Sequence, residues 1–204
     1  MKWYGRLSCL NPVPGDRMNA SDVFRRIVAA LDEAGIPHML TGSFASSLHG
    51  LTRATQDIDL VIAPSESQLR ELVGSLPSEE YYVDLDTALE ALQRRSQFNV
   101  IDLETGWKVD LIVRRDRPFS VQEFERRKEI DFSGIRLAVA TVEDLILAKL
   151  EWATQGSSQR QIEDVAGVLR VRYQEMDLEY VENWVSRLKL EDAWDHARRE
   201  AGIG

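Results

Sequence analysis

The stretch TGSFASSLHGLTRATQDIDLVI, residues 41–62, ends with two aspartates that alternate with large apolar residues. In a β-strand, side chains at positions i and i+2 point to the same side of the sheet, about 7 Å apart. We therefore expect Asp57 and Asp59 to project together, while Ile58 and Leu60 face the core. Two neighbouring carboxylates repel each other, and a divalent cation offsets that repulsion most directly. The stretch predicts a strand that carries a metal site.

A Gly-Ser pair precedes these aspartates. Gly42-Ser43 lies between an expected strand, residues 38–41, and an expected short helix, residues 43–49. At such a turn, backbone N–H groups can face an anion, Gly42 permits close approach and Ser43 adds a hydroxyl donor. Asp110, in the apolar run KVDLIV, could complete a site for one or two metal ions. Because Mg²⁺ prefers carboxylate and phosphate oxygens, the pattern favours a nucleoside triphosphate and in-line attack on phosphorus.

Each of these features also has an ordinary structural explanation. An Asp-x-Asp pair can be a solvated strand end, a Gly-Ser pair can be a simple turn, and Asp110 can be an exposed hairpin residue. Their order and spacing, with apolar residues between and after the aspartates, favour the functional interpretation.

The composition narrows the classes of function. The chain has 204 residues, 44% of them hydrophobic, and a formal net charge of −9, which suits one compact core or a main domain with a smaller helical attachment. We find neither a membrane span nor a signal pattern, and we expect a cytoplasmic protein without a membrane partner. One cysteine and three separated histidines exclude an internal disulfide and argue against a metal centre rich in these residues. Because nucleic-acid binding depends on positive charge, any such contact must use a local patch.

The chain is expected to have three parts. Residues 1–18 read as a loose N-terminal extension, with Met18 as an alternative start. Residues 19–140 should form an α/β core, with helices at residues 22–34 and 87–95, a capped helix after Ser65, strands at residues 38–41 and 58–63, and hairpins turning near residues 104–106 and 133–134. Residues 141–204 should be helical, with helices over residues 142–155 and 159–175 and one or two helices over residues 178–201. This order predicts an α+β fold, a mixed sheet flanked by helices and followed by a helical C-terminal part.

The motifs together resemble a known family. Gly42-Ser43, thirteen further residues and then Asp57-Ile58-Asp59-Leu60 resemble the signature of the polymerase-β-like nucleotidyltransferase superfamily. More narrowly, RATQDIDLVI, TGWKVDLIV and TVEDLILAKLEWATQGSSQRQIEDVAGVL are similar to segments of the AbiEii/AbiGii group of abortive-infection and type IV toxin nucleotidyltransferases. The likeness covers about residues 22–169. It implies a nucleotidyltransferase-like fold, an NTP substrate and Mg²⁺ as cofactor, with Mn²⁺ as an alternative.

The resemblance also implies roles for the residues of the first motif. Asp57 and Asp59 would bind the metal ion, and Asp110 would be a supporting metal carboxylate or a general base. Gly42, Ser43 and the adjoining amides would hold the triphosphate.

Further residues gain implied roles in the same way. Lys149 matches a helical lysine that reaches the nucleotide phosphates, and Asp164 matches an acidic residue that activates or orients the acceptor. Arg53 and Thr55 would add phosphate or loop contacts. Two structural alternatives stay open, because Lys149 could extend to solvent from a half-buried helix and Asp164 could form a surface pair with Arg160.

Three functions remain open at this point. The first is transfer of a nucleotide to RNA, at a tRNA 3′ end, by a toxin whose partner is a cognate antitoxin. The second is transfer to a small molecule such as a cationic aminoglycoside, which the acidic chain would suit. The third is a non-catalytic nucleotide-binding module. Basic clusters at residues 114–117 and 126–128 could bind acceptor phosphates or be solvated charges. Trp152 is expected to lie in the core or at a subunit contact, rather than to stack on a base.

Overall fold

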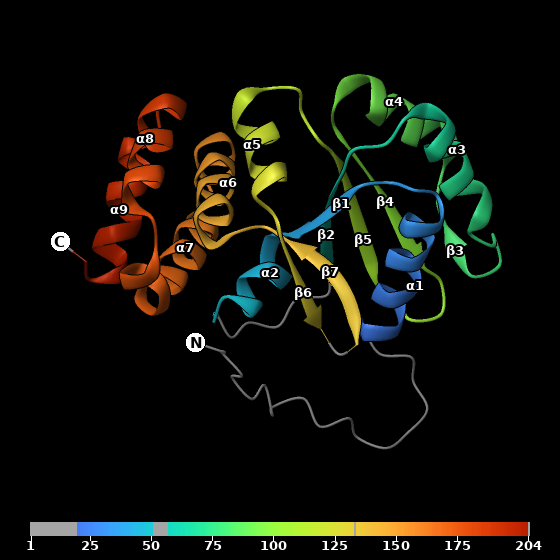
Figure 1. Cartoon of the computed structure of the whole chain (residues 1–204), viewed down its shortest axis with the longest axis horizontal. Helices are drawn as coiled ribbons and strands as arrows, with labels where there is room; N and C mark the ends of the chain where they lie inside the picture. Colours follow the sequence, from blue (N-terminus) through green and yellow to red (C-terminus); the bar gives the residue numbers. More distant parts are fainter. Residues whose placement is uncertain (1–19, 51–56, 133, 204) are drawn as a thin grey trace, which may run out of the picture.

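A computed structural model describes residues 20–50, 57–132 and 134–203 of the chain (Figure 1). The strands are β1 His38–Thr41, β2 Asp57–Ile62, β3 Tyr81–Tyr82, β4 Gln97–Asp102, β5 Lys108–Val113, β6 Lys128–Phe132 and β7 Ile135–Val139. Within the described ranges they form a seven-stranded mixed sheet in the order β3-β4-β5-β2-β1-β7-β6.

Helices cover the sheet and then continue as a separate helical group. They are α1 Ala20–Glu33, α2 Gly42–Leu48, α3 Glu66–Ser75, α4 Leu85–Arg94, α5 Pro118–Arg126, α6 Val142–Gly156, α7 Gln159–Arg172, α8 Leu178–Leu188 and α9 Glu191–Ala201, with a 3₁₀ turn at Tyr173–Glu175. Helices α1, α3 and α4 lie at one end of the molecule, and α6 to α9 gather at the other (Figure 1). The predicted α+β fold with a helical C-terminal part is confirmed.

Local sequence chemistry fixes several element boundaries. The Ser65 hydroxyl accepts a hydrogen bond from the Gln68 N–H at 3.3 Å, and the Gln68 side chain accepts one from the Ser65 N–H at 2.9 Å, so α3 begins at the expected capping box. The Thr141 hydroxyl likewise accepts from the Asp144 N–H at 3.2 Å, which starts α6. Strands β4 and β5, and strands β6 and β7, form the two expected antiparallel pairs.

Other elements differ from expectation. Helix α5 and the two-residue strand β3 were not predicted from the sequence. The helix expected at residues 159–175 ends at Arg172 and continues as the 3₁₀ turn. Residues 178–201, where one or two helices were expected, form two, because Lys189 adopts a left-handed conformation with φ of +59° and ends α8.

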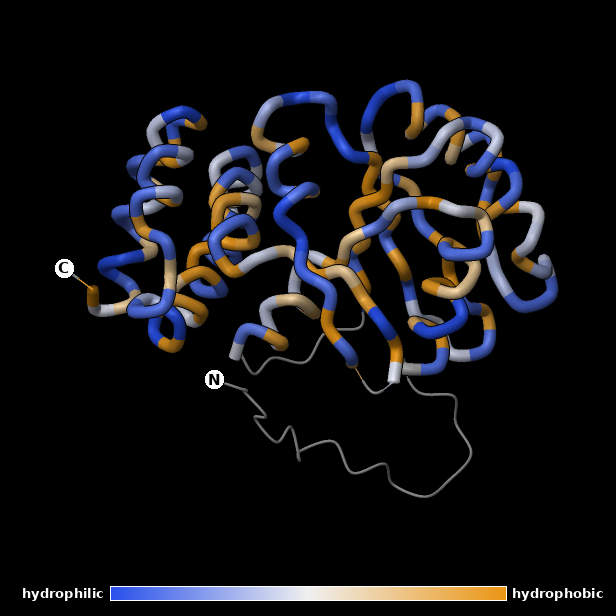
Figure 2. Tube along the Cα trace, viewed as in Figure 1, coloured by the Kyte–Doolittle hydropathy of each residue, from blue (hydrophilic) through white to orange (hydrophobic). Residues whose placement is uncertain are grey.

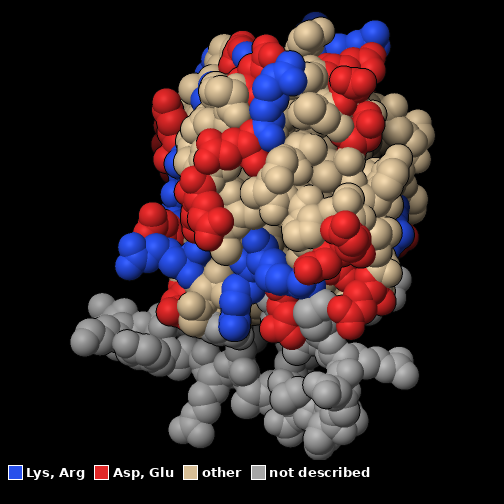
Figure 3. All heavy atoms as spheres, turned by 90° about the vertical axis from the view of Figure 1, so that its right-hand side faces the viewer, with Lys and Arg blue, Asp and Glu red and all other residues tan. Residues whose placement is uncertain are grey.

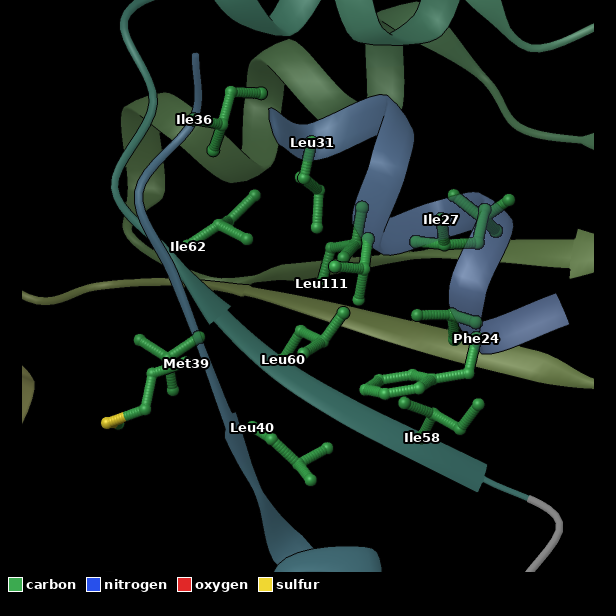
Figure 4. Close-up of a cluster of buried hydrophobic side chains, with 14 of the residues drawn as sticks. Phe24, Ile27, Leu31, Ile36, Met39, Leu40, Ile58, Leu60, Ile62 and Leu111 are labelled. Carbon is green, nitrogen blue, oxygen red and sulfur yellow. The ribbon is translucent and has the colours of Figure 1, made fainter. Parts of the chain in front are cut away.

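The hydrophobic core has two clusters. The first joins the apolar side of α1 to the sheet, where Phe24, Ile27 and Leu31 face Ile58 and Leu60 (Figure 4). Apolar segments accordingly concentrate along the central strands (Figure 2).

The second cluster lies among the C-terminal helices. It includes apolar residues from α6 to α9 and also Phe119 of α5, whose ring centroid is 5.2 Å from that of Trp184. Helix α5 therefore packs against the helical part, although it precedes residue 141. No helix in the described ranges combines the length and apolar character needed to cross a bilayer.

Candidate active site

Strand register brings two carboxylates together at the centre of the sheet. In the parallel pair of β2 and β5, Asp59 lies directly opposite Asp110. In the antiparallel pair of β1 and β2, Asp59 lies opposite Thr41, the last residue before Gly42. Residues at matching positions of neighbouring strands point to the same face. The second aspartate of the motif, the separate aspartate of β5 and the Gly-Ser turn therefore meet on one face of the sheet.

The surroundings of Asp59 disfavour ionisation of this carboxyl group beside Asp110. Burial raises the pKa of Asp59 above its usual value, and the nearby charge of Asp110 raises it further. Lys149 and a hydrogen bond donated by the Ser43 backbone N–H act in the opposite direction. A bound cation would relieve the repulsion between the two carboxylates.

Asp57 lies farther out, where a lysine bridges the carboxylates. It is opposite Lys108 in the register of β2 and β5. The Lys108 ammonium lies 2.8 Å from Oδ2 of Asp110 and 3.6 Å from Oδ1 of Asp57. The hydrogen bond to Asp110 raises the pKa of Lys108, which keeps the ammonium charged. This residue was not singled out in the sequence, although its place two positions before Asp110 on a strand puts both side chains on the same face.

The Gly-Ser turn contacts the carboxylates closely. Gly42 has a φ of +66°, and a Cβ at this position would lie 1.9 Å from Oδ2 of Asp59. A side chain larger than hydrogen is therefore excluded both by the backbone conformation and by the aspartate. The need for glycine at this position follows from the proximity of Asp59.

Lys149 and Asp164 form a buried ion pair between α6 and α7. Their side chains are 4% and 6% exposed, and the Lys149 ammonium lies 2.8 Å from Oδ2 of Asp164. The ammonium also donates to Oε1 of Gln161 at 3.1 Å. Lys149 does not extend into solvent, and Asp164 bonds across the helix interface, so the two simpler structural alternatives are wrong.

These groups surround one cavity of about 240 Å³. Its lining includes Thr41, Gly42, Ser43, Asp59, Asp110, Leu145, Lys149, Trp152 and Gln161. Asp164 contacts Lys149 from behind the wall of the cavity, which favours a positioning role over direct contact with an acceptor.

The carboxylates suit a metal ion that is shared with a substrate. Among the described residues, no three His, Cys, Asp or Glu side chains are arranged to hold a metal ion by themselves. Asp59 and Asp110 nevertheless lie side by side in the cavity wall. Because Mg²⁺ in phosphate-binding sites often uses one or two carboxylates with substrate phosphates and water, this pair fits such an ion. Asp57 lies one position farther out along the same face of the strand and shares the Lys108 ammonium with Asp110.

Comparisons with known proteins relate this architecture to solved structures. No protein-family model matches the chain, and no curated protein matches its sequence. The structure is similar to that of the antibiotic-resistance factor ANT(2'')-Ia, with a TM-score of 0.51 and 17% identity, over 89% of this chain and 99% of that protein. An antigenic nucleotidyltransferase-like protein from Paracoccidioides brasiliensis matches with a TM-score of 0.48 and 20% identity, over 83% of this chain and 90% of that one. What the chain shares with ANT(2'')-Ia is the fold.

The similarity to ANT(2'')-Ia agrees with the nucleotidyltransferase-like architecture expected from the superfamily motifs. The narrower likeness to the AbiEii/AbiGii group rests on the sequence motifs alone. Arg53 and Thr55, like the N-terminal extension and Met18, lie outside the described residues. The remaining residues of the expected site are Gly42, Ser43, Asp59, Asp110 and Lys149 in the cavity wall, with Asp57 and Asp164 next to them.

Proposed function

We propose that this protein is a nucleotidyltransferase that moves a nucleoside monophosphate from an NTP to an acceptor hydroxyl. The observation that carries the proposal is the pairing of Asp59 and Asp110 in one cavity with Gly42, Ser43 and Lys149. Paired carboxylates that can hold a metal ion, a hydroxyl donor and a lysine are groups that phosphoryl-transfer sites use. The fold shared with ANT(2'')-Ia agrees with this proposal.

In the proposed reaction, the acceptor oxygen attacks the α-phosphorus of the NTP. A new P–O bond forms, the bond to the bridging oxygen breaks, and pyrophosphate leaves. Asp59 and Asp110 would hold Mg²⁺, or Mn²⁺ in its place, and a bound ion would supply charge neutralisation at the phosphates. Asp57 would support the same ion on the open side of the site, and Asp110 is also the candidate to take the proton of the acceptor hydroxyl.

The other side chains would bind and orient the triphosphate. The Ser43 hydroxyl and the adjoining amides would contact the phosphates beside Gly42. Lys149 would pair with phosphate charge from the opposite wall, and Asp164 would hold its ammonium in place. Arg53 and Thr55 are proposed to add contacts from the segment that precedes β2.

RNA is the proposed acceptor, at a tRNA 3′ end, with the protein acting as a toxin that a cognate antitoxin neutralises. The motifs similar to the AbiEii/AbiGii group support this choice. A second candidate is a small antibiotic-type acceptor, which is favoured by the net charge of −9, since an acidic protein attracts a cationic aminoglycoside.

Incubation with each α-labelled NTP and Mg²⁺, with total tRNA or an aminoglycoside as acceptor, tests the proposal. The wild type is compared with Asp59→Asn and with Asp195→Asn, a matched change at an exposed position of α9. We expect labelled tRNA from the wild type and from Asp195→Asn, and none from Asp59→Asn. Label on an aminoglycoside alone would select the second candidate. Nucleotide binding that is independent of Mg²⁺ and leads to no transfer would instead indicate a non-catalytic module.

A further inference from the structure

A second cavity continues from the candidate active site along the sheet. It has a volume of about 260 Å³ and reaches the residues that join β5 to α5 and the last turns of α6. The two cavities share five lining residues: Thr41, Gln97, Ile112, Ala148 and Trp152. A molecule in the second cavity would therefore adjoin one bound beside Asp59 and Asp110.

The second cavity is rich in arginine. Its lining includes Arg95, Arg114, Arg115 and Arg117. Arg117 pairs with Glu151, and Arg95 and Arg114 share the single carboxylate of Asp116. Arg115 is exposed, and within the described ranges no carboxylate forms an ion pair with it. Positive charge thus exceeds negative charge around this cavity, in a protein whose net charge is −9. On the face shown in Figure 3, by contrast, acidic and basic side chains are interspersed.

These arginines are separate from the groups proposed to bind the NTP. The triphosphate is assigned to the first cavity, where Ser43 and Lys149 lie. A second group of cations then requires a second source of phosphate, because guanidinium groups bind phosphate oxygens with good geometric fit. A nucleic-acid strand supplies phosphates that a cationic aminoglycoside lacks.

Trp152 provides a flat apolar surface at the junction of the cavities. It lies one turn beyond Lys149 on α6, it lines both cavities, and it is 48% exposed. Of the two expected places for this side chain, the core is therefore wrong, and a subunit contact stays a prediction. A half-exposed tryptophan beside arginines is the arrangement on which single-stranded nucleic acids stack their bases.

Glu123 offers an unused hydrogen-bonding group in the same cavity. It lies on α5, lines the cavity and is 7% exposed. Its carboxyl group forms no hydrogen bond with the described part of the chain, since the side chain of the neighbouring Arg117 bonds to Ser120 and Glu151. Buried polar groups are normally paired, so a ligand with its own donor and acceptor would satisfy this carboxyl group.

We propose that the second cavity binds the 3′-terminal nucleotide of an acceptor strand. Trp152 stacks on the terminal base, the Glu123 carboxyl group hydrogen-bonds to the edge of that base, and Arg114 and Arg115 contact the phosphates. The inference rests on the proposed function, because it assigns the NTP to the first cavity.

Burial, with the nearby charges of Asp144 and Glu151, raises the pKa of Glu123 to about 8. The carboxyl group is therefore protonated near neutral pH and can both donate and accept a hydrogen bond. Adenine, cytosine and uracil each present one donor next to one acceptor on an edge, so a neutral carboxyl group can pair with any of them. Guanine presents such a pair as well, at N1–H and O6, and in addition two neighbouring donors at N1–H and N2–H, which suit the ionised form.

Fluorescence anisotropy with 5′-fluorescein-labelled pentaribonucleotides, each ending in a free 3′-hydroxyl, tests the assignment. We expect Trp152→Ala to weaken binding about tenfold, and Arg115→Gln to reduce the slope of log affinity against log salt by about 0.7. Glu123→Ala should weaken binding of oligo(A), while Glu123→Gln, which keeps a donor and an acceptor, should retain it. The control is Arg94→Gln, an exposed arginine of α4 that is paired within its own helix.

A parallel titration with a fluorescent ATP analogue separates failure of this inference from failure of the proposed function. We expect Arg115→Gln to leave affinity for the analogue unchanged. If the variants weaken ATP binding and leave oligonucleotide binding intact, the cavity holds the base of the NTP and the assignment is wrong. It is also wrong if no oligonucleotide binds, or if binding is insensitive to both Trp152→Ala and Arg115→Gln. If Trp152→Ala and Arg115→Gln weaken oligonucleotide binding but the wild type transfers no label, the inference holds and the proposed transferase function is wrong.

Discussion

Replacing Glu123 by glutamine is predicted to stabilise the protein, and by more as the pH rises. Glu123 is 7% exposed, and its carboxyl group has a pKa of about 8, against an ordinary value of 4.5. Burial is the main cause, and the charges of Asp144 and Glu151 on α6 act in the same direction, while Arg117 opposes them. Glutamine has nearly the same shape and carries no charge at any pH.

The size of the effect follows from proton linkage. Below about pH 4.5 the carboxyl group is protonated in both the folded and the unfolded chain, and it contributes no pH dependence. Between pH 4.5 and about 8 the unfolded chain releases this proton and the folded chain keeps it, so the wild type loses stability as the pH rises. Each pH unit in this window costs about 1.4 kcal/mol. The advantage of Glu123→Gln in free energy of unfolding should therefore grow by about 4 kcal/mol from pH 5 to pH 8, and then level off.

Urea unfolding at pH 5, 6, 7 and 8 measures this difference directly. Glu71→Gln, at an exposed position of α3, is the matched control and should show little change with pH. If the difference between Glu123→Gln and the wild type is constant over this range, Glu123 is not buried as a neutral acid. The second cavity would then lack its proposed hydrogen-bond donor.

Three further changes test the candidate active site. Gly42→Ala forces alanine into a left-handed conformation, which costs about 1–2 kcal/mol, and places its Cβ 1.9 Å from a carboxylate oxygen of Asp59. We expect this variant to have a lower Tm and to lose label transfer. The control Gly74→Ala, at an open position of a helix, should leave stability unchanged or raise it. Lys108→Gln removes the ammonium that bridges two carboxylates, so Mn²⁺ should bind more tightly in a calorimetric titration, and weaker binding would contradict competition between lysine and metal. Lys149→Met leaves the buried Asp164 charge without its ammonium partner and should lower the free energy of unfolding, measured in urea, by about 3–5 kcal/mol. Adding Asp164→Leu should recover most of that loss. If stability is not recovered, the ion pair is not the cause of the loss.

Much of the fold could be predicted because local rules determine it. The capping box at Ser65 and Gln68 and the cap at Thr141 each fix a helix start through contacts within four residues. The alternation of Asp57 to Leu60 likewise determines which side chains face the core. Helix α5 has only nine residues, too few to show a helical period clearly. Its one clear sequence signal is the proline at the first helical position.

The meeting of the two carboxylates in the candidate active site depended on information that no local pattern contains. Asp59 and Asp110 meet because β2 and β5 pair in parallel with a fixed register, although the residues are far apart in sequence. The motifs predicted that both would matter, and the register determines that they are neighbours.

Tertiary packing also decided the partner of Asp164. Arg160 is four residues away on the same helix and is the partner that helix geometry alone suggests. The packing of α6 against α7 instead brings Lys149 within 2.8 Å, in a site from which water is largely excluded. A buried charge gains far more from a close buried partner than from an exposed one at the helix surface, so the long-range pair is formed. For the same reason, the ion-pair partner of a charged residue that follows a strand or lies on an apolar helix should be sought first on the elements that can bury it. Its neighbours in sequence should be considered only afterwards.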